Sequence, residues 1–312
     1  MSDETPEHPS AAGRVAQAYA SETRTMSFGL SSAILLAPAL VICAIFIFIP
    51  ALLAVFGSLF EFGMTSQNWK WVGVGNYTRA FSDPIFWGAL KNNLFIVFGS
   101  IVTQVGIGCM LAAILDRGLP RGSTVFRTII FMPMIISSVA VALIWLIIFD
   151  PNIGILNAIV KSVGLIPPSL GWLGDPDISI WMVLVVAAWQ ATGFMMVLIL
   201  AGLQSLPDEI YEAAALDGAK GLKAFWYITL PSIRNVLLVA VLITTIGGFK
   251  VFDLIFVLTQ GGPANATQVL GTYIYLQAFN LTNMGYANAI SVVLLVIAVV
   301  LGWLQLNASR RA

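Results

Sequence analysis

Long apolar runs alternate with short polar segments along this chain of 312 residues. A helix needs about 20 apolar residues to cross roughly 30 Å of hydrocarbon, and a helix pairs all of its backbone groups internally. Six runs are long enough, although the fifth contains polar interruptions. We predict transmembrane helices at Ser31–Phe60, Asn92–Leu115, Thr128–Phe149, Ile180–Leu203, Val236–Leu258 and Tyr286–Leu306. The pattern therefore predicts an all-α integral membrane protein with six transmembrane helices.

Composition supports a lipid environment. Hydrophobic residues make up 59% of the chain and charged residues 10%, whereas a soluble domain has about a quarter of its residues charged. The net charge is zero and no basic cluster is present, so we expect no nucleic-acid partner. Cys43 and Cys109 lie inside apolar runs, which argues against a disulfide framework, and the single histidine, His8, argues against a metal site.

The polar segment 1–28 precedes the first apolar run. It lacks the apolar core and the small-residue cleavage site of a secretory signal, so we expect a disordered cytoplasmic tail followed by an uncleaved signal-anchor. The predicted organisation is this tail, 1–28, and a six-helix domain, 29–312.

Lysine and arginine are unevenly divided between the two sets of polar segments, and the richer side of a multi-pass protein is cytoplasmic. One set holds ten: Arg14, Arg24, Arg117, Arg121, Arg127, Lys220, Lys223, Arg234, Arg310 and Arg311. The other set holds four: Lys70, Arg79, Lys91 and Lys161. We therefore expect both termini and the segment 212–231 to be cytoplasmic. An even number of crossings agrees with both termini on one side.

The segments predicted to be external, 61–91 and 150–179, are rich in tryptophan. Such residues anchor helices at the membrane surface, or they form a docking surface for an external protein, and the sequence leaves both interpretations open. These tryptophans are Trp69, Trp71, Trp87 and Trp172.

The cytoplasmic segment "SLPDEIYEAAALDG" has the signals of a short helix. Ser205 is placed as its N-cap, Pro207 suits its first turn, and Gly218 is placed to end it in a left-handed conformation. A second short helix, "LKAFWYIT", follows and is punctuated by Pro231. The two helices predict a helix–turn–helix hairpin.

One face of the first helix carries Tyr211, Ala214, Ala215 and Gly218 at helical spacing. Small residues allow another surface to approach closely, which is typical of a helix that lies in a partner's groove. The alternative, a helix resting on lipid headgroups, favours basic residues on the polar face. The first helix has none, so the partner interpretation is favoured.

The spacing Glu212-Ala213-Ala214, Gly218, Ile228 and Leu230-Pro231 resembles the EAA motif, EAA-x3-G-x9-I-x-LP, of permease subunits of ABC-type importers at every fixed position. The resemblance implies a type I importer permease fold in which residues of about 205–231 are coupling helices. These helices enter a cleft on a cytoplasmic ATPase subunit and transmit its closure. The residues that the resemblance assigns to coupling are Glu212, Ala213, Ala214, Asp217, Gly218, Ile228, Leu230 and Pro231.

Further segments resemble the carbohydrate-uptake branch, especially its maltose-F type: "FRTIIFMPMIIS", "AGLQSLPDEIYEAAALDGA", "FDLIFVLTQGGP" and "GYANAIS". The chain departs from that type in lacking a large external domain and extra N-terminal crossings. The resemblance implies a bacterial or archaeal inner-membrane location. It also implies these partners: a second, different permease subunit, two copies of the ATPase, an external solute-binding protein, membrane lipid and a sugar.

No G-x-x-x-x-G-K-[ST] phosphate-binding loop occurs in the sequence. We therefore expect no ATPase activity and no cofactor on this chain, with ATP and Mg bound by the partner ATPase. The chain is expected to be a transport subunit and not an enzyme.

Polar residues inside crossings usually face a cavity or a partner, because burial in lipid is costly. Sugars bind aromatic faces and amide groups, which favours Trp189, Gln190 and Phe194. Lys250 and Asp253, three residues apart, either neutralise each other on one helix face or reach the pathway. The predicted substrate-pathway residues are Asn93, Gln104, Trp189, Gln190, Phe194, Thr244, Gly247, Gly248, Lys250, Val251 and Asp253.

Other functions remain as alternatives. An importer of a phosphate-bearing solute, such as a glycerol phosphate, would favour several basic residues in the spans, and only Lys250 is there. A secondary transporter predicts repeated broken helices, which the sequence does not suggest. Pro38 and Pro133 are candidate bending points for alternating access.

Overall fold

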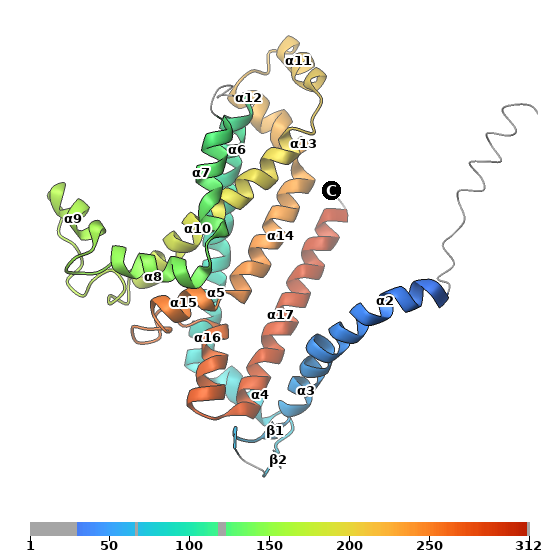
Figure 1. Cartoon of the computed structure of the whole chain (residues 1–312), viewed down its shortest axis with the longest axis vertical. Helices are drawn as coiled ribbons and strands as arrows, with labels where there is room; N and C mark the ends of the chain where they lie inside the picture. The colour runs from blue at the N-terminus through green and yellow to red at the C-terminus, as the bar shows by residue number, and fades with distance from the viewer. Residues whose placement is uncertain (1–29, 66–67, 118–122, 311–312) are drawn as a thin grey trace, which may run out of the picture. The chain divides into compact units, whose positions relative to one another are not determined.

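The computed structural model describes residues 30–65, 68–117 and 123–310, and it is mostly helical (Figure 1). The predicted N-terminal tail, 1–28, lies outside the described residues. The chain divides into two units, Met1–Leu53 and Ala54–Ala312, which are considered separately.

The first apolar run forms one uninterrupted helical stretch. It consists of α2 (Leu30–Cys43), a π-helical segment η1 (Ala44–Phe48) and α3 (Ile49–Gly57), which runs into the second unit. Its span Leu35–Gly57 has a mean hydropathy of 3.0. The helix continues through Pro38 without a break. The observed helix agrees with the first predicted crossing.

Three further long helical runs in the second unit agree with predicted crossings. The first joins α5 (Pro84–Ser100), the π-helical η2 (Ile101–Ile107) and α6 (Gly108–Arg117), and the others are α10 (Ser179–Leu203) and α17 (Met284–Arg310). The first run begins before the predicted Asn92, because the Asp83 carboxylate accepts a hydrogen bond from the Ile85 N–H at 2.9 Å and caps α5.

The third predicted crossing is not one straight helix. It is split into α7 (Ser123–Ile135) and α8 (Ser138–Ile148), whose axes differ by 99°. Pro133 lies in the last turn of α7, where a proline removes a backbone donor, and Ser137 has an extended backbone, with φ −55° and ψ 137°. We call residues 134–138 the elbow. Apolar length predicted the segment but could not reveal the bend.

The fifth predicted crossing is also interrupted. Helix α14 (Arg234–Lys250) ends at Lys250, Val251 is extended with φ −61° and ψ 118°, and a short helix, α15 (Asp253–Leu258), follows. The prediction of a continuous helix to Leu258 was therefore wrong. Among the described residues, four helices are long and apolar enough to cross a membrane. The number is six if two bent pairs each count as one crossing, namely Thr124–Ile135 with Ser138–Ile148 and Leu222–Ser232 with Arg234–Lys250.

Most of the remaining short elements lie at the two ends of the second unit (Figure 1). At one end lie α11 (Asp208–Leu216), α12 (Leu222–Ala224), the π-helical η3 (Phe225–Thr229) and α13 (Leu230–Ser232). At the other lie β1 (Phe60–Glu61), β2 (Lys70–Trp71) and α4 (Gly75–Ser82). Elsewhere are α9 (Ile155–Ser162), α16 (Leu270–Tyr275) and the π-helical η4 (Leu276–Asn280). The antiparallel pair β1–β2 is the one departure from an all-α fold among the described residues.

Helix α10 is central to the packing of the second unit, because it contacts α6, α7 and η2. Gly193 makes the close approach to α7 feasible, since a Cβ atom there would lie 2.1 Å from the Ile130 carbonyl oxygen. Small residues allow helix backbones to approach in this way in membrane proteins. This packing brings the middle of α10 against the elbow.

Candidate functional site

A cavity of about 550 Å³ lies where the interrupted helices meet, and we call it the central cavity. Its walls come from α5, η2, the elbow, α10, α14 and the start of α15. Nine predicted pathway residues line it: Gln104, Gln190, Phe194, Thr244, Gly247, Gly248, Lys250, Val251 and Asp253. The polar residues Ser100, Ser137 and Ser138 also line it and were not predicted. The volume is in the range of about 300–1,000 Å³ that is usual for small-molecule sites.

Gln190 joins α10 to the elbow. Its amide nitrogen donates hydrogen bonds to the Ile136 carbonyl oxygen at 3.1 Å and to Ser138 Oγ at 3.3 Å. The Ile136 carbonyl needs such a partner because α7 has already ended. The two bonds use the amide N–H groups, and the carbonyl oxygen of Gln190 remains as an acceptor for a ligand hydroxyl.

Another part of the lining comes from η2 and α14. Gln104 is buried and donates to Ser100 Oγ and to the Ala187 carbonyl oxygen, each at 3.2 Å. Thr244 is also buried, and its hydroxyl lies 3.7 Å from Met195 Sδ. The half-buried ring of Phe194 lines the same cavity as these neutral hydrogen-bonding groups. The wall therefore combines polar groups with an aromatic surface.

Lys250 and Asp253 line the cavity but do not form the expected pair. The helix ends between them, so the spacing of three residues does not place them on one helix face. The ion pair found among the described residues joins Lys70 and Glu61 instead. The prediction that Lys250 and Asp253 neutralise each other on one helix face was wrong, because it assumed an unbroken α14.

Asn93 lies outside the central cavity and is fully buried. Its side chain donates to the Gly248 carbonyl oxygen at 3.1 Å and accepts from the Leu270 N–H at 2.8 Å. Gly248 is in the last turn of α14 and Leu270 begins α16, so both backbone groups lack a partner within their own helix. Asn93 thus holds two helix ends together. This role could not be predicted from the sequence, because the two partners are more than 150 positions away.

Trp189 also lies outside the central cavity. It is 42% exposed, and its ring meets Trp145 edge to face with centroids 5.7 Å apart. Trp145 belongs to α8, so this contact is part of the packing between α8 and α10. The neighbouring Gln190 points to the cavity because successive helical residues lie about 100° apart.

The hairpin α11–α13 has the termination that the sequence predicted. Gly218 has a φ of +77°, the Ala219 N–H bonds to the Ala214 carbonyl oxygen at 2.9 Å, and the Gly218 N–H bonds to that of Ala215 at 3.3 Å. The start differs, because α11 begins at Asp208 and Ser205 Oγ donates to the Gly202 carbonyl oxygen instead of capping α11. Ser205 was therefore wrongly predicted as the N-cap.

The exposed surface of this hairpin differs from the small-residue face expected from the sequence. Glu212, Ala213, Asp217, Gly218 and Pro231 are exposed. Three predicted coupling residues lie further inside, because Ala214 is buried and Ile228 and Leu230 are half-buried. Five large apolar side chains are exposed and were not predicted: Ile210, Leu216, Leu222, Trp226 and Tyr227.

The hairpin packs on the bundle through Phe225 and Leu230, which contact the buried core cluster of α6 and α10. The Thr229 hydroxyl donates to Tyr211 Oη at 3.2 Å, which joins η3 to α11. A cavity of about 510 Å³ lies behind the hairpin, between Ile114 of α6, Leu203 of α10 and Phe225 of η3. Large exposed apolar side chains on such a hairpin are typical of a surface that a partner covers.

At the other end of the second unit, Asp83 accepts hydrogen bonds from the hydroxyls of Tyr273 and Tyr286, the latter at 2.7 Å. Gln277 donates to Tyr273 Oη at 2.9 Å and accepts from Asn283 at 3.1 Å. We call these five residues the Asp83 cluster. Burial raises the pKa of Asp83, but hydrogen bonds from the two tyrosines and from backbone N–H groups outweigh burial, so its pKa lies below the ordinary value.

No group of three or more His, Cys, Asp or Glu side chains within residues 30–65, 68–117 and 123–310 could hold a metal ion. The candidate site is instead a polar cavity bordered by two interrupted helices inside an apolar helical bundle. Interrupted helices around a polar cavity are typical of membrane transport proteins.

The chain belongs to the family described as binding-protein-dependent transport system inner membrane component, whose model matches residues 104–312. It is therefore a multi-pass membrane subunit of an ABC transporter, a permease and not an enzyme. The predicted membership of the chain in the ABC importer permeases is confirmed.

Individual relatives agree with this assignment. The chain is 41% identical to the probable ABC transporter permease protein YurN of Bacillus subtilis, over 87% of this chain and 93% of that protein. It is 34% identical to the trehalose/maltose transport system permease protein MalF of Thermococcus litoralis, over 89% and 94%. A chain in the crystal structure of a bacterial alginate ABC transporter, in complex with its alginate pentasaccharide-bound periplasmic protein, superposes with a TM-score of 0.79 at 25% identity, over 90% of this chain and 94% of that one. The type I importer permease fold is thus established.

Proposed function

We propose that this chain forms half of the translocation pathway of an ATP-driven, binding-protein-dependent importer for a mono-, di- or oligosaccharide. The six proposed crossings are the four long helical runs, the bent pair α7–α8 and the helix α14. The positive-inside rule places both termini and the hairpin α11–α13 in the cytoplasm, and β1, β2 and α4 outside. Relatives named for trehalose, maltose and alginate transport support a sugar as the solute.

The central cavity is the observation that carries this proposal. It offers neutral hydrogen-bonding groups from Gln104, Gln190 and Thr244 beside the ring of Phe194. A sugar has hydroxyls that need such partners and apolar ring faces that stack on aromatic groups. This chain leaves the cavity open, so a second permease subunit is proposed to close it.

The charges of the cavity argue against a phosphate-bearing solute. Lys250 and Asp253 both line it, so its lining includes one cation and one anion. A site for a phosphate dianion would be expected to carry a surplus of positive charge. A neutral solute suits this balance better.

The hairpin is proposed to receive the motion of the ATPase. Its exposed apolar residues Leu222, Trp226 and Tyr227 fit a groove on a partner, and the exposed Glu212 and Asp217 would fix its orientation. Two ATPase copies, one for each permease, would bind ATP and Mg. Closure of the ATPases would then shift the permease pair between inward-open and outward-open states.

The test is a solute panel on the complete transporter in proteoliposomes. Maltose, trehalose, an oligosaccharide, glycerol 3-phosphate and spermidine would each be added with the solute-binding protein, and ATP hydrolysis and uptake measured. The proposal expects sugars alone to stimulate both. Stimulation by glycerol 3-phosphate or spermidine and by no sugar would refute it.

A further inference from the structure

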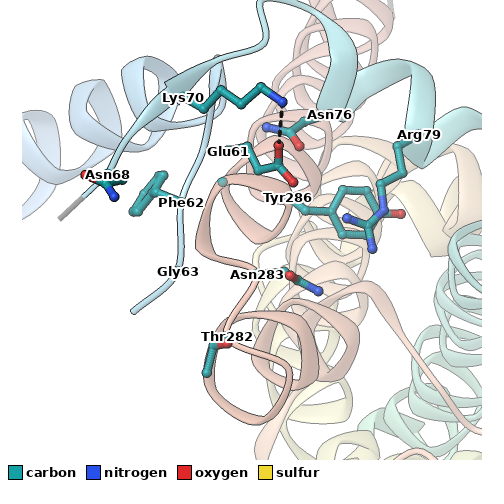
Figure 2. Close-up of a pocket in the computed structure, with 11 residues that line it drawn as sticks. Glu61, Phe62, Gly63, Asn68, Lys70, Asn76, Arg79, Thr282, Asn283 and Tyr286 are labelled. Atoms are coloured by element: carbon teal, nitrogen blue, oxygen red, sulfur yellow. Dashed lines mark ion pairs between the residues drawn. The ribbon is translucent and has the colours of Figure 1, made fainter. Parts of the chain in front are cut away.

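A polar pocket of about 450 Å³ lies where β1, β2 and α4 meet the start of α17, and we call it the outer pocket (Figure 2). The proposed orientation places it outside the membrane, and it shares no lining residue with the central cavity. Its charged residues are Glu61, Lys70 and Arg79. Nothing in the proposed transport pathway uses this pocket.

The walls of the outer pocket are held in place before any partner arrives. Asn76 donates two hydrogen bonds of 2.9 Å, to the carbonyl oxygens of Ser58 and Phe60. The Gly285 N–H donates a hydrogen bond to the Phe62 carbonyl oxygen at 3.4 Å. A Cβ atom on Gly285 would lie 1.9 Å from the Phe60 carbonyl oxygen, so the two segments are in close contact. The hairpin β1–β2 is therefore fastened to both α4 and α17, and the pocket is preorganised.

Arg79 is an exposed cation with a fixed position. Its guanidinium carbon lies 4.3 Å from the centroid of the Tyr286 ring. Figure 2 shows these two side chains together. The Tyr286 hydroxyl donates in turn to Asp83. Among the described residues, no carboxylate lies within ion-pairing distance of Arg79. An arginine that rests on an aromatic face keeps its planar N–H groups for a bidentate contact with a carboxylate.

The other two charges of the outer pocket offset each other. Lys70 Nζ lies 3.9 Å from a carboxylate oxygen of Glu61, and both side chains are well exposed. Arg79 therefore leaves the pocket with an excess of one positive charge. This balance favours an anionic group.

Aromatic side chains extend from the pocket onto the neighbouring surface. Phe62 stacks on Trp69 with ring centroids 4.0 Å apart, and Phe60 meets Trp71 at 5.0 Å. Trp69 and Trp71 are 49% and 61% exposed. Exposed tryptophans beside an available arginine are typical of the centre of a protein–protein interface.

We propose that the outer pocket and its aromatic border dock the external solute-binding protein, and that Arg79 receives an aspartate or glutamate side chain of that protein. This inference rests on the proposed function, because it requires a solute-binding protein on this side of the membrane. It also selects between the two roles that the sequence left open for Trp69 and Trp71.

The experiment measures binding of the labelled solute-binding protein to the complete transporter in nanodiscs. The probe is the solute-binding protein that stimulates ATP hydrolysis by the wild-type transporter. Arg79→Glu is expected to raise its Kd about tenfold or more, and this difference should shrink when salt rises from about 50 to about 300 mM. The matched control is Lys161→Glu, which reverses the charge of another exposed cation on the proposed outer side. We expect this variant to leave the Kd unchanged.

A second variant works in the opposite direction and does not touch the Tyr286 contact. Glu61→Gln frees Lys70, so it is expected to lower the Kd about two- to threefold. An unchanged Kd in both Arg79→Glu and Glu61→Gln would overturn the docking proposal. Direct binding of glucuronate to the transporter alone, abolished by Arg79→Glu, would also overturn it, since the pocket would then be a solute site.

The wild-type transporter separates this proposal from the proposed function. If the wild type imports sugar with its binding protein but Arg79→Glu binds that protein normally, only the docking site is wrong. If the wild type shows no ATP-driven sugar uptake, the proposed function itself fails. At saturating binding protein, Arg79→Glu is expected to keep the maximal uptake rate of the wild type.

Discussion

The hairpin α11–α13 and the opposite end of the second unit are held in different ways. The hairpin has large exposed apolar side chains and a cavity of about 510 Å³ behind it. The opposite end is tied by the Asp83 cluster and by buried Asn93, which bond α5, α14, α16 and α17 to one another. The opposite end also has exposed tryptophans and a pocket, but this network of buried polar groups fixes its shape. We therefore expect a partner to position the hairpin, whereas the opposite end is a frame held in shape by this chain.

The largest expected effect separates the two ends through a matched pair of glycines. Gly218 in the hairpin and Gly164 in the predicted external segment both have a φ of +77° with open space around them. A valine at either position meets a similar backbone penalty of roughly 1–2 kcal/mol. We expect Gly218→Val to reduce ATP-driven uptake more than about tenfold, because it distorts the coupling helices.

The control for this experiment is Gly164→Val, which should leave uptake near the wild-type rate. Both variants would be compared at equal amounts of assembled transporter in proteoliposomes. Equal losses in the two variants would show that backbone strain, and not the position of the hairpin, caused the defect.

The second prediction concerns the frame. Asn93→Leu leaves the Gly248 carbonyl and the Leu270 N–H without partners, and each buried unpaired group costs about 1–3 kcal/mol. We expect a lower thermal unfolding midpoint for the purified complex, measured by intrinsic fluorescence. Asn235→Leu, at an exposed position of α14, is the control and should unfold like the wild type. A stable Asn93→Leu protein with defective coupling would contradict the assignment of Asn93 to the frame.

The third prediction uses two neighbours in the middle of α10. Gln190→Ala is expected to raise the KM for the sugar about two- to tenfold, because one hydrogen bond contributes about 0.5–1.5 kcal/mol. Trp189→Ala should change KM less, since Trp189 lies outside the central cavity. Initial uptake rates over a range of sugar concentrations would measure both values. A larger effect of Trp189→Ala would move the solute site away from the central cavity.

The smallest effect is expected from the charge of the Asp83 cluster. Because the pKa of Asp83 is lower in the folded protein, the ionised form adds stability above the ordinary pKa of 3.8, and this stability is lost as the pH falls through the lower, folded value. Asp83→Asn should therefore unfold at a slightly lower temperature than the wild type at pH 7. The difference should disappear under strongly acidic conditions.

Thermal unfolding at several pH values would test this prediction, with exposed Asp177→Asn as the control. A difference that grew as the pH fell would contradict the lowered pKa and weaken the comparison between the two ends.

The lining of the central cavity was predictable in large part, because polar side chains inside apolar runs avoid lipid and usually face a cavity or a polar partner. Gln104, Gln190 and Thr244 all reached its wall. The same rule failed for Asn93, whose side chain satisfies two helix ends instead of a solute. Polarity alone does not distinguish these roles, since both relieve the cost of burying polar groups.

The outer pocket could not be predicted in the same way. Its residues come from positions 61–79 and 282–286, which nothing in the sequence connects. The excess charge on Arg79 became evident only when the structure paired Lys70 with Glu61.

The sequence by itself determined the apolar runs, the uneven distribution of positive charge and the EAA-like spacing, because each depends on neighbours along one stretch of chain. Tertiary structure decided the bend between α7 and α8, the end of α14 at Lys250 and the partners of Asn93 and Arg79. The physical reason is that hydrophobic length is local, whereas a buried polar group is satisfied by whichever donor or acceptor the packing brings within reach.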